Sequence, residues 1–235
     1  HKLSTTISAK NYKIIDLNGN YLIPGVIDDQ VHFREPGLTH KANIFSESRA
    51  AVAGGITSFM EMPNTNPPVL SQELLQQKFD IAKYNSLANY SFFMGVSNTN
   101  INEVLKTDFG KVPGLKIFMG SSTGNMLVDD FTVLNNIFSN VEGLIAVHCE
   151  DENTIKENII KYKTKFGENV PIEYHPNIRS EEACYKSSAL AVSLAKKYST
   201  RLHVLHISTE RELDLFSNDI GLKQKKIPQK LAFII

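Results

Sequence analysis

The stretch GVIDDQVHFREPG, residues 25–37, decides the fold class. An apolar, β-branched run leads into a group of titratable side chains, which is the pattern of a buried strand that ends at a polar rim. His32 and Arg34 come at this end, and Gln30 stands where a second histidine would make chemical sense for a metal site. The stretch therefore predicts a buried strand that delivers chemical groups to a site.

Five further units of strand and helix follow the first. Apolar runs at 56–62, 90–96, 114–120, 143–150 and 201–208 alternate with helical patterns at 43–55, 71–85, 100–107, 128–140, 151–167, 180–199 and 209–218. This alternation predicts an α/β fold with a parallel sheet. Six units without a reversal of order favour an incomplete (β/α)8 TIM-type barrel, lacking two units, over an open doubly wound sheet.

The two ends of the chain depart from this pattern. Residues 1–22 contain a predicted hairpin at DLNGNYL and are expected to be the remnant of a small N-terminal β-domain. Residues 23–219 are expected to form the partial barrel, and residues 220–235 an atypical tail. The chain starts at His1 and stops in an apolar run, so we expect it to be truncated at both ends, or frame-shifted at the second.

Composition excludes several classes of function. The 235 residues include 25 Lys plus Arg and 25 Asp plus Glu, so no basic excess argues for nucleic acid. The apolar runs are far too short to span a membrane, and no signal-peptide pattern is present. Two cysteines make no disulfide framework, which favours a cytoplasmic protein.

Four basic side chains lie on four different predicted strands, at or near the ends where barrel enzymes gather their chemistry: His32, Lys116, His148 and His206. Lys116 looks functional by itself, because a buried ammonium is costly unless it is paired or neutralised. A lone histidine is more often a hydrogen-bonded core residue than a ligand, and His203 fits either role. Together the four favour a metal site over separate core polar residues.

Two further residues point to substrate recognition. Arg34 suits a bidentate contact with a carboxylate, and equally suits a surface ion pair with Glu35. Asn64 lies in the loop MPNTNPP, where prolines would hold its side chain rigidly, although a plain surface turn fits this loop equally well.

The motifs resemble those of the class I-like dihydroorotases, within the cyclic amidohydrolase superfamily. The matching stretches, from about Leu22 to Ser217, are PGVIDDQVHFREPG, AAVAGGITSFMEMPNTNPP, GLKIFMGSSTG, AVHCED and LHVLHIST. The resemblance implies a metal-dependent hydrolase barrel that reversibly hydrolyses (S)-dihydroorotate, a small molecule, to N-carbamoyl-L-aspartate in pyrimidine biosynthesis. A homodimer is the assembly that the family implies.

The resemblance also implies roles for single residues. His32 matches the second histidine of the metal motif on the first strand. Lys116 matches a lysine that carries a carbamate, an N6-carboxylated side chain, and bridges two zinc ions. His148 and His206 match the ligands of the second metal. Arg34 matches a residue that holds the substrate carboxylate, and so does the asparagine of MPNTNP, Asn64.

The sequence departs from the family at two points. Gln30 replaces the first histidine of the His-X-His motif, and its neutral carbonyl is a weak zinc ligand. The family's catalytic aspartate has no counterpart after His206, because Asp214 and Asp219 belong to the last helical stretch or follow it directly. We therefore expect one or two zinc ions in a working parent protein with an altered first metal, and no activity from this chain alone.

Two alternatives to a dihydroorotase stay open. An allantoinase or hydantoinase-type enzyme is the first, and Arg34 discriminates because only a substrate with a carboxylate gives it a partner. A non-catalytic dihydroorotase-like scaffold is the second, supported by Gln30 and the missing aspartate.

Overall fold

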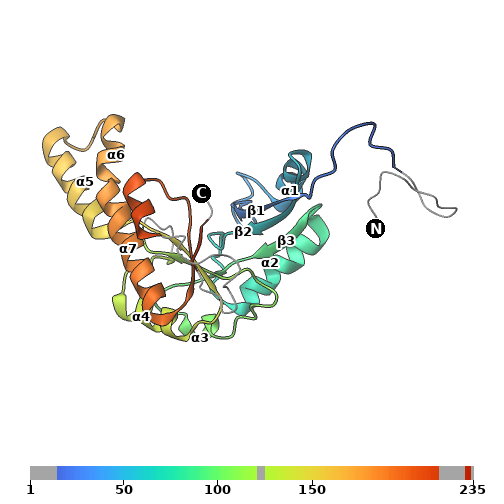
Figure 1. The fold of residues 1–235 in the computed structure, drawn as a ribbon. Helices are drawn as coiled ribbons and strands as arrows, with labels where there is room; N and C mark the ends of the chain where they lie inside the picture. Colours follow the sequence, from blue (N-terminus) through green and yellow to red (C-terminus); the bar gives the residue numbers. More distant parts are fainter. Residues whose placement is uncertain (1–14, 121–124, 217–230, 234–235) are drawn as a thin grey trace.

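A computed structural model describes residues 15–120, 125–216 and 231–233, and its strands alternate with helices along the chain (Figure 1). The strands are β1 (Val26–Val31), β2 (Ile56–Glu61), β3 (Asn89–Phe92), β4 (Met94–Gly95), β5 (Leu115–Phe118), β6 (Leu144–His148), β7 (Arg201–Val204) and β8 (Leu231–Phe233). The α-helices are α1 (Ile44–Ala53), α2 (Gln72–Asn85), α3 (Ile101–Val104), α4 (Phe131–Asn140), α5 (Glu152–Phe166), α6 (His175–Ile178) and α7 (Glu181–Tyr198). Two 3-10 helices, η1 (Ile172–Tyr174) and η2 (Glu210–Leu215), complete the described elements.

The sheet follows the order of the chain. Its strands form two hydrogen-bonded sets, in the orders β1-β2-β3 and β4-β5-β6-β7-β8. All neighbouring strands within each set are parallel. The third predicted strand is divided at Phe93, whose N–H still donates to Glu61 O at 3.0 Å, while Met94 N–H turns to Gly114 O at 3.1 Å. Consecutive parallel strands without reversal confirm the incomplete (β/α)8 barrel and exclude the doubly wound alternative.

The sheet curls so far that its first strand meets its seventh. Asp29 of β1 and His203 of β7 form an ion-pair contact, with Oδ2 and Nδ1 3.7 Å apart. His203 is in register with Ala146 of β6, which is in register with Lys116 of β5. These residues therefore form one level of side chains across the strands, as the interior of a βα barrel requires.

The helices pack against the outer face of the sheet through a large apolar core. Phe59, Phe92, Leu115, Ile145 and Leu202 are among its fully buried members. Each side chain of this size contributes roughly 1.5–3 kcal/mol by leaving water. A second, smaller cluster contains Met62, Phe93, Ala146 and Leu205. The near-continuous apolar strands β5 and β6 are buried on both faces. The prediction of a buried first strand is wrong: β1 has no fully buried residue, and Val26 and Ile27 are 53% and 59% exposed.

Side-chain caps begin the longer helices. Asn43, Ser71, Asp130, Asp151 and Ser180 each accept a hydrogen bond from a backbone N–H of the first turn. At the start of α2, for example, Leu74 N–H donates to Oγ of Ser71 at 3.2 Å. Four of these helices follow a strand and its loop, whereas α7 follows η1 and α6.

Several predicted elements are shorter than expected. The helix predicted at 100–107 is the single turn α3, and the one predicted at 209–218 is the 3-10 helix η2. Between α5 and α7 the chain forms η1 and α6, which the sequence patterns did not predict. Helices this short bury too few residues to show a helical period.

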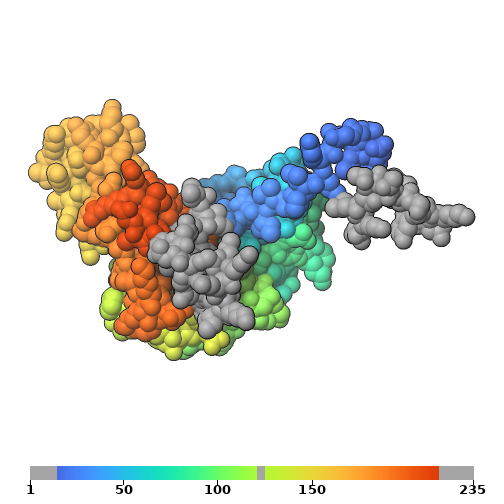
Figure 2. All heavy atoms as spheres, viewed as in Figure 1, coloured from blue at the N-terminus to red at the C-terminus, as the bar shows by residue number. Residues whose placement is uncertain are grey.

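The ends of the chain differ in part from expectation. Residues 15–25 contain a turn, with Asn20 N–H donating to Leu17 O at 2.9 Å, but no strand, so the hairpin prediction is wrong for this segment. This segment projects from one end of the surface, while α5 and α6 project from the other (Figure 2). The predicted tail, 220–235, contains β8, which adds a further parallel strand beside β7. Residues 1–14, 217–230 and 234–235 lie outside the described residues, and the division into a β-domain remnant, barrel and tail stays a prediction.

Among the described helices, none has the length and the hydropathy needed to cross a bilayer.

Candidate functional site

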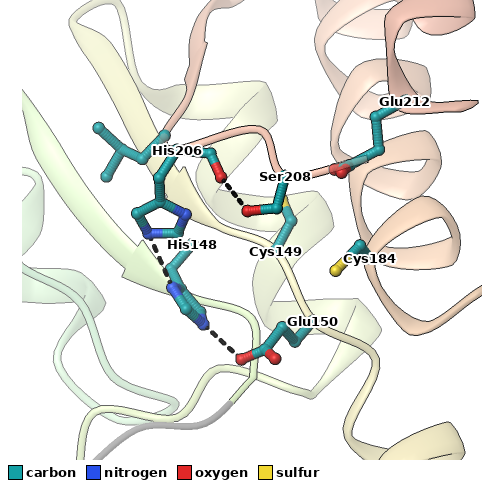
Figure 3. A pocket seen from close by; sticks show the side chains of 8 residues that line it. His148, Cys149, Glu150, Cys184, His206, Ser208 and Glu212 are labelled. Carbon is teal, nitrogen blue, oxygen red and sulfur yellow. Dashed lines mark hydrogen bonds and ion pairs between the residues drawn. The ribbon is translucent and has the colours of Figure 1, made fainter. Parts of the chain in front are cut away.

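Two predicted ligands come together where β6 and β7 end. His148 is the last residue of β6, and His206 follows β7 by two residues, with a φ of 39°. Nδ1 of His148 lies 3.0 Å from Nε2 of His206, and the ring centroids are 4.8 Å apart. Figure 3 shows the nearest nitrogens of the two rings pointing at each other, with the ring planes inclined at 68°. The rings lie at the side of a cavity of about 120 Å³. The cavity is lined by His148, Cys149, Glu150, Cys184, Leu205, His206, Ser208 and Glu212.

Glu150 orients the first of these rings. Its Oε2 lies 2.8 Å from Nε2 of His148, on the side of the ring away from His206 (Figure 3). Arg179, in the loop before α7, forms an ion pair with the same carboxylate oxygen. A carboxylate on one ring nitrogen fixes the tautomer and aims the other nitrogen, as it does for metal-binding histidines.

The local electrostatics keep His206 neutral. Partial burial, then His148 and then Lys116, hold the pKa of His206 at about 4. Ser208 donates to the backbone oxygen of His206 at 2.8 Å and braces the turn that carries it. At pH 7 the ring therefore has a free lone pair, which is the form that binds a metal.

Lys116 lies inside the sheet on β5 and is 1% exposed. Burial lowers the pKa of this amine to about 7. Its Nζ lies 4.2 Å from the centre of the Phe118 ring and 3.4 Å from Ile117 O, and no carboxylate pairs with it in the part of the chain that the structure describes. Phe118 in turn is in register with His148. About half of the amine is therefore neutral at pH 7, and the neutral form is the one that can react with CO₂.

His32 and Asn64 lie side by side beyond β1 and β2. Burial is the main cause that lowers the pKa of His32 to about 4, and the charges of Arg34 and Lys116 act in the same direction. The Asn64 amide is close enough to favour the protonated ring, but its Oδ1 does not meet the geometry of a hydrogen bond. This buried amide oxygen has no partner among the described residues, as expected of a group that awaits a ligand.

The loops after β1 and β2 dock on each other. Asn66 N–H donates to Pro36 O at 3.2 Å, and a Cβ on Gly37 would lie 1.8 Å from Asn66 O. Glu35 accepts from the first N–H of α1, that of Ile44, at 2.9 Å and so caps this helix. Among the described residues no carboxylate pairs with the Arg34 guanidinium, so the surface ion pair with Glu35 is not formed.

Gln30 is half-buried in β1, and its backbone N–H donates to Oδ1 of Asp28 at 3.1 Å. Its carboxamide makes no hydrogen bond to another described residue. The structure thus leaves Gln30 as a neutral group where the resemblance implies an imidazole.

The residues at β6 and β7 fit a zinc ion. Two nitrogens bound to one zinc at tetrahedral angles lie roughly 3.3 Å apart, close to the 3.0 Å between His148 and His206. Within the described ranges, however, no three side chains of His, Cys, Asp or Glu gather closely enough to hold an ion. A third ligand must then come from another source, such as a carboxylated Lys116, and the metal roles of these residues and of His32 stay predictions.

Several charged residues near the site were not predicted. Glu150 directly follows the strand of His148, so the search at strand ends that found the histidine could have found it too. Asp29 is the neighbour of Gln30 in β1, and no feature of the sequence distinguished its side chain as a functional one. Glu61 ends β2 and pairs with Lys78 of α2, with Oε2 and Nζ 3.0 Å apart. On a helix rich in charged residues, Lys78 reads as solvent-facing, so its burial could not be predicted.

A parallel βα barrel with histidines at the carboxyl ends of its strands and a lysine buried within another strand defines the class of the protein as a barrel amidohydrolase. A profile of the family described as "Dihydro-orotase-like" matches residues 19–212. The chain belongs to this dihydroorotase-like family.

Individual relatives agree with this assignment. A dihydroorotase of Methanosphaera stadtmanae is 34% identical over 203 residues, which cover 86% of this chain and 46% of the relative. An allantoinase of Deinococcus radiodurans is 29% identical, with 88% of this chain and 47% of the relative covered. The solved L-hydantoinase (dihydropyrimidinase) of Arthrobacter aurescens superposes with a TM-score of 0.79 at 26% identity, over 84% of this chain and 45% of that one. The chain thus spans slightly less than half the length of the relatives it matches.

Proposed function

We propose that this chain carries the first half of a dihydroorotase site, for the reversible hydrolysis of the cyclic amide of dihydroorotate to N-carbamoyl aspartate. The observation that carries the proposal is the pair of docked loops after β1 and β2. They present two side chains that can donate to an anion: the Arg34 guanidinium, with which no carboxylate pairs among the described residues, and the Asn64 carboxamide, whose Nδ2 is a donor. A substrate carboxylate is the complementary group for the guanidinium.

The site residues divide into binding and metal-holding groups. His148 and His206 would hold one zinc ion, and His32 with a carboxylated Lys116 would hold a second. Zinc there would acidify a water and polarise the amide carbonyl. Arg34 and Asn64 would orient the ring by its carboxylate, so that the amide carbon faces the histidines. An ion beside His32 would be held more weakly, because Gln30 offers only a neutral carbonyl where an imidazole would bind.

Calorimetric binding tests this function without requiring turnover. We expect the 235-residue chain to bind dihydroorotate more tightly than dihydrouracil, which is the same ring without the carboxylate. Arg34→Met should remove this difference in affinity. The binding free energy of dihydroorotate should become less favourable by about 1.5–3 kcal/mol, the contribution of a hydrogen bond to a charged group. Equal affinity for both compounds in the unchanged chain would refute the proposal and favour a hydantoinase-type substrate.

A non-catalytic scaffold is the second candidate. Two observations favour it. Among the described residues, no three side chains of His, Cys, Asp or Glu lie close enough together to hold a metal ion, and Gln30 replaces a histidine ligand of the family. Zinc per chain, measured by elemental analysis after purification in zinc-containing buffer, separates the two. A metal-free chain would support the scaffold. The two free cysteines, Cys149 buried and Cys184 half-buried, support a cytoplasmic setting for either function.

A further inference from the structure

Glu61 at the end of β2 and Lys78 in α2 form a completely buried ion pair. Lys78 Nζ lies 3.0 Å from Glu61 Oε2, and both side chains are 0% exposed. Burial raises the pKa of Glu61 and lowers the pKa of Lys78, while their mutual attraction opposes both shifts. Replacing such a pair by apolar residues is often neutral or stabilising, so stability by itself does not explain why the pair is present.

One end of the pair holds the loop that carries Arg34. Glu61 Oε1 accepts from the backbone N–H of Arg34 at 3.1 Å. Arg34 has a φ of 71°, a left-handed conformation that is unfavourable for a non-glycine residue. A hydrogen bond to a charged acceptor is among the stronger ones in proteins and can hold this conformation.

The other end holds the loop that carries Asn64. Lys78 Nζ donates to the backbone oxygen of Met62 at 3.0 Å, and Met62 N–H donates to Val31 O at 3.0 Å. Asn64 follows Met62 by two residues. The start of this loop is therefore held both to α2 and to the end of β1.

We propose that the Glu61–Lys78 pair is a positioning device that sets Arg34 and Asn64 at the separation required to bind one carboxylate. Neither Glu61 nor Lys78 contacts that carboxylate, and both act through the backbone of the two loops. The identity of the ligand rests on the proposed function, whereas the coupling of the loops does not. Lys78 lies on α2, which packs on the outside of the sheet. A shift of this helix would therefore move the loops that carry Arg34 and Asn64 and change the selectivity for a carboxylate.

Two double variants separate positioning from stability. Glu61→Gln with Lys78→Met removes both charges but keeps an acceptor for the Arg34 N–H, and Glu61→Leu with Lys78→Met removes the acceptor as well. We expect the Arg34 amide to exchange its hydrogen about tenfold faster in the leucine variant than in the glutamine variant, measured by NMR on the 235-residue chain. Equal exchange rates in the two variants would overturn the proposal.

Binding then tests the consequence for the ligand. The leucine variant should bind dihydroorotate about tenfold more weakly than the glutamine variant, and adding Arg34→Met should abolish this difference, as expected for coupled residues. If Arg34→Met weakens binding but the two variants bind equally well, the positioning role is refuted. If Arg34→Met leaves binding unchanged, the proposed function fails, and the exchange measurement still decides whether Glu61 holds the loop.

Discussion

The imidazoles of His148 and His206 lie with their nearest nitrogens 3.0 Å apart, although 58 residues separate them in the chain. They meet because β6 and β7 are adjacent and parallel, so that their carboxyl ends reach the same rim. Glu150 occupies the other nitrogen of His148, at 2.8 Å. With its N–H directed at Glu150, His148 keeps a lone pair on Nδ1, and a cation bound between the two rings would replace the hydrogen bond that now joins them.

Removal of either imidazole should weaken zinc binding. We expect His148→Ala and His206→Ala each to lower zinc affinity by about tenfold or more, because each deletes a direct ligand. Competition with a chromophoric chelator measures the affinity. His175→Ala, on the exposed surface of α6, is the matched control. Zinc affinity that is the same in all three variants would contradict the assignment of this site.

Lys116 should make stability depend on pH above neutrality. Burial lowers its pKa from 10.5 to about 7, so between these values the unfolded chain binds more protons than the folded chain. The free energy of unfolding should then rise with pH, by up to about 1.4 kcal/mol per unit. Lys116→Met should be more stable at pH 7 and should lack this slope.

The measurement is urea unfolding of both proteins between pH 7 and about 8.5, in buffer free of bicarbonate and zinc. Higher pH is avoided because burial raises the pKa of Cys149 to about 12 and that of Cys184 to about 11, which reverses the slope once unfolded thiols ionise. Parallel pH profiles for the two proteins would show that the Lys116 amine is not buried in solution.

Gly37 should be far less tolerant of substitution than Gly55. Both have positive φ, 79° and 88°, so alanine costs roughly 1–2 kcal/mol at either position. Only at Gly37 does the new Cβ meet another loop, at 1.8 Å from Asn66 O, whereas nothing lies within 4 Å of it at Gly55. We expect Gly37→Ala to cost roughly 3 kcal/mol or more in urea unfolding and to weaken dihydroorotate binding. Similar losses for both variants would argue against docking of the two loops.

The core around β6 should behave as a packed interior. Ile145 is fully buried in this strand, so Ile145→Ala should lower the free energy of unfolding by about 2–5 kcal/mol. Ile160, on α5, is 66% exposed, and Ile160→Ala should change it by less than about 0.5 kcal/mol. Chemical denaturation at one pH measures both. A small loss at Ile145 would mean that the sheet is loosely packed.

Much of the fold and part of the site follow from local patterns. The strands of Lys116 and His148 are visible as apolar runs, since burial on both faces demands such runs wherever they occur. Lys116 stood out because an ammonium among apolar neighbours must have a reason. The single-turn helix α3 and the division of the third strand at Phe93 were not predicted, because each depends on which neighbour the backbone meets.

Glu61 and Lys78 mark the limit of such inference. Their partnership depends on how α2 packs against β2 and so exists only in three dimensions. The same holds for Asp29 and His203, which meet only because the sheet curls until its first and seventh strands face each other.

By itself, the sequence determined the alternation of strands and helices through β7, apart from η1, α6 and the division of the third strand. It also determined the family motifs and the residues at strand ends, because periodicity and the cost of burying charge are local properties of a chain. The tertiary structure alone decided which of these residues meet. It placed His148 against His206, brought no carboxylate of the described residues to Arg34, and joined the loops after β1 and β2 through Glu61. Those contacts depend on packing between segments far apart in the chain, where a shift of one ångström makes or breaks a hydrogen bond.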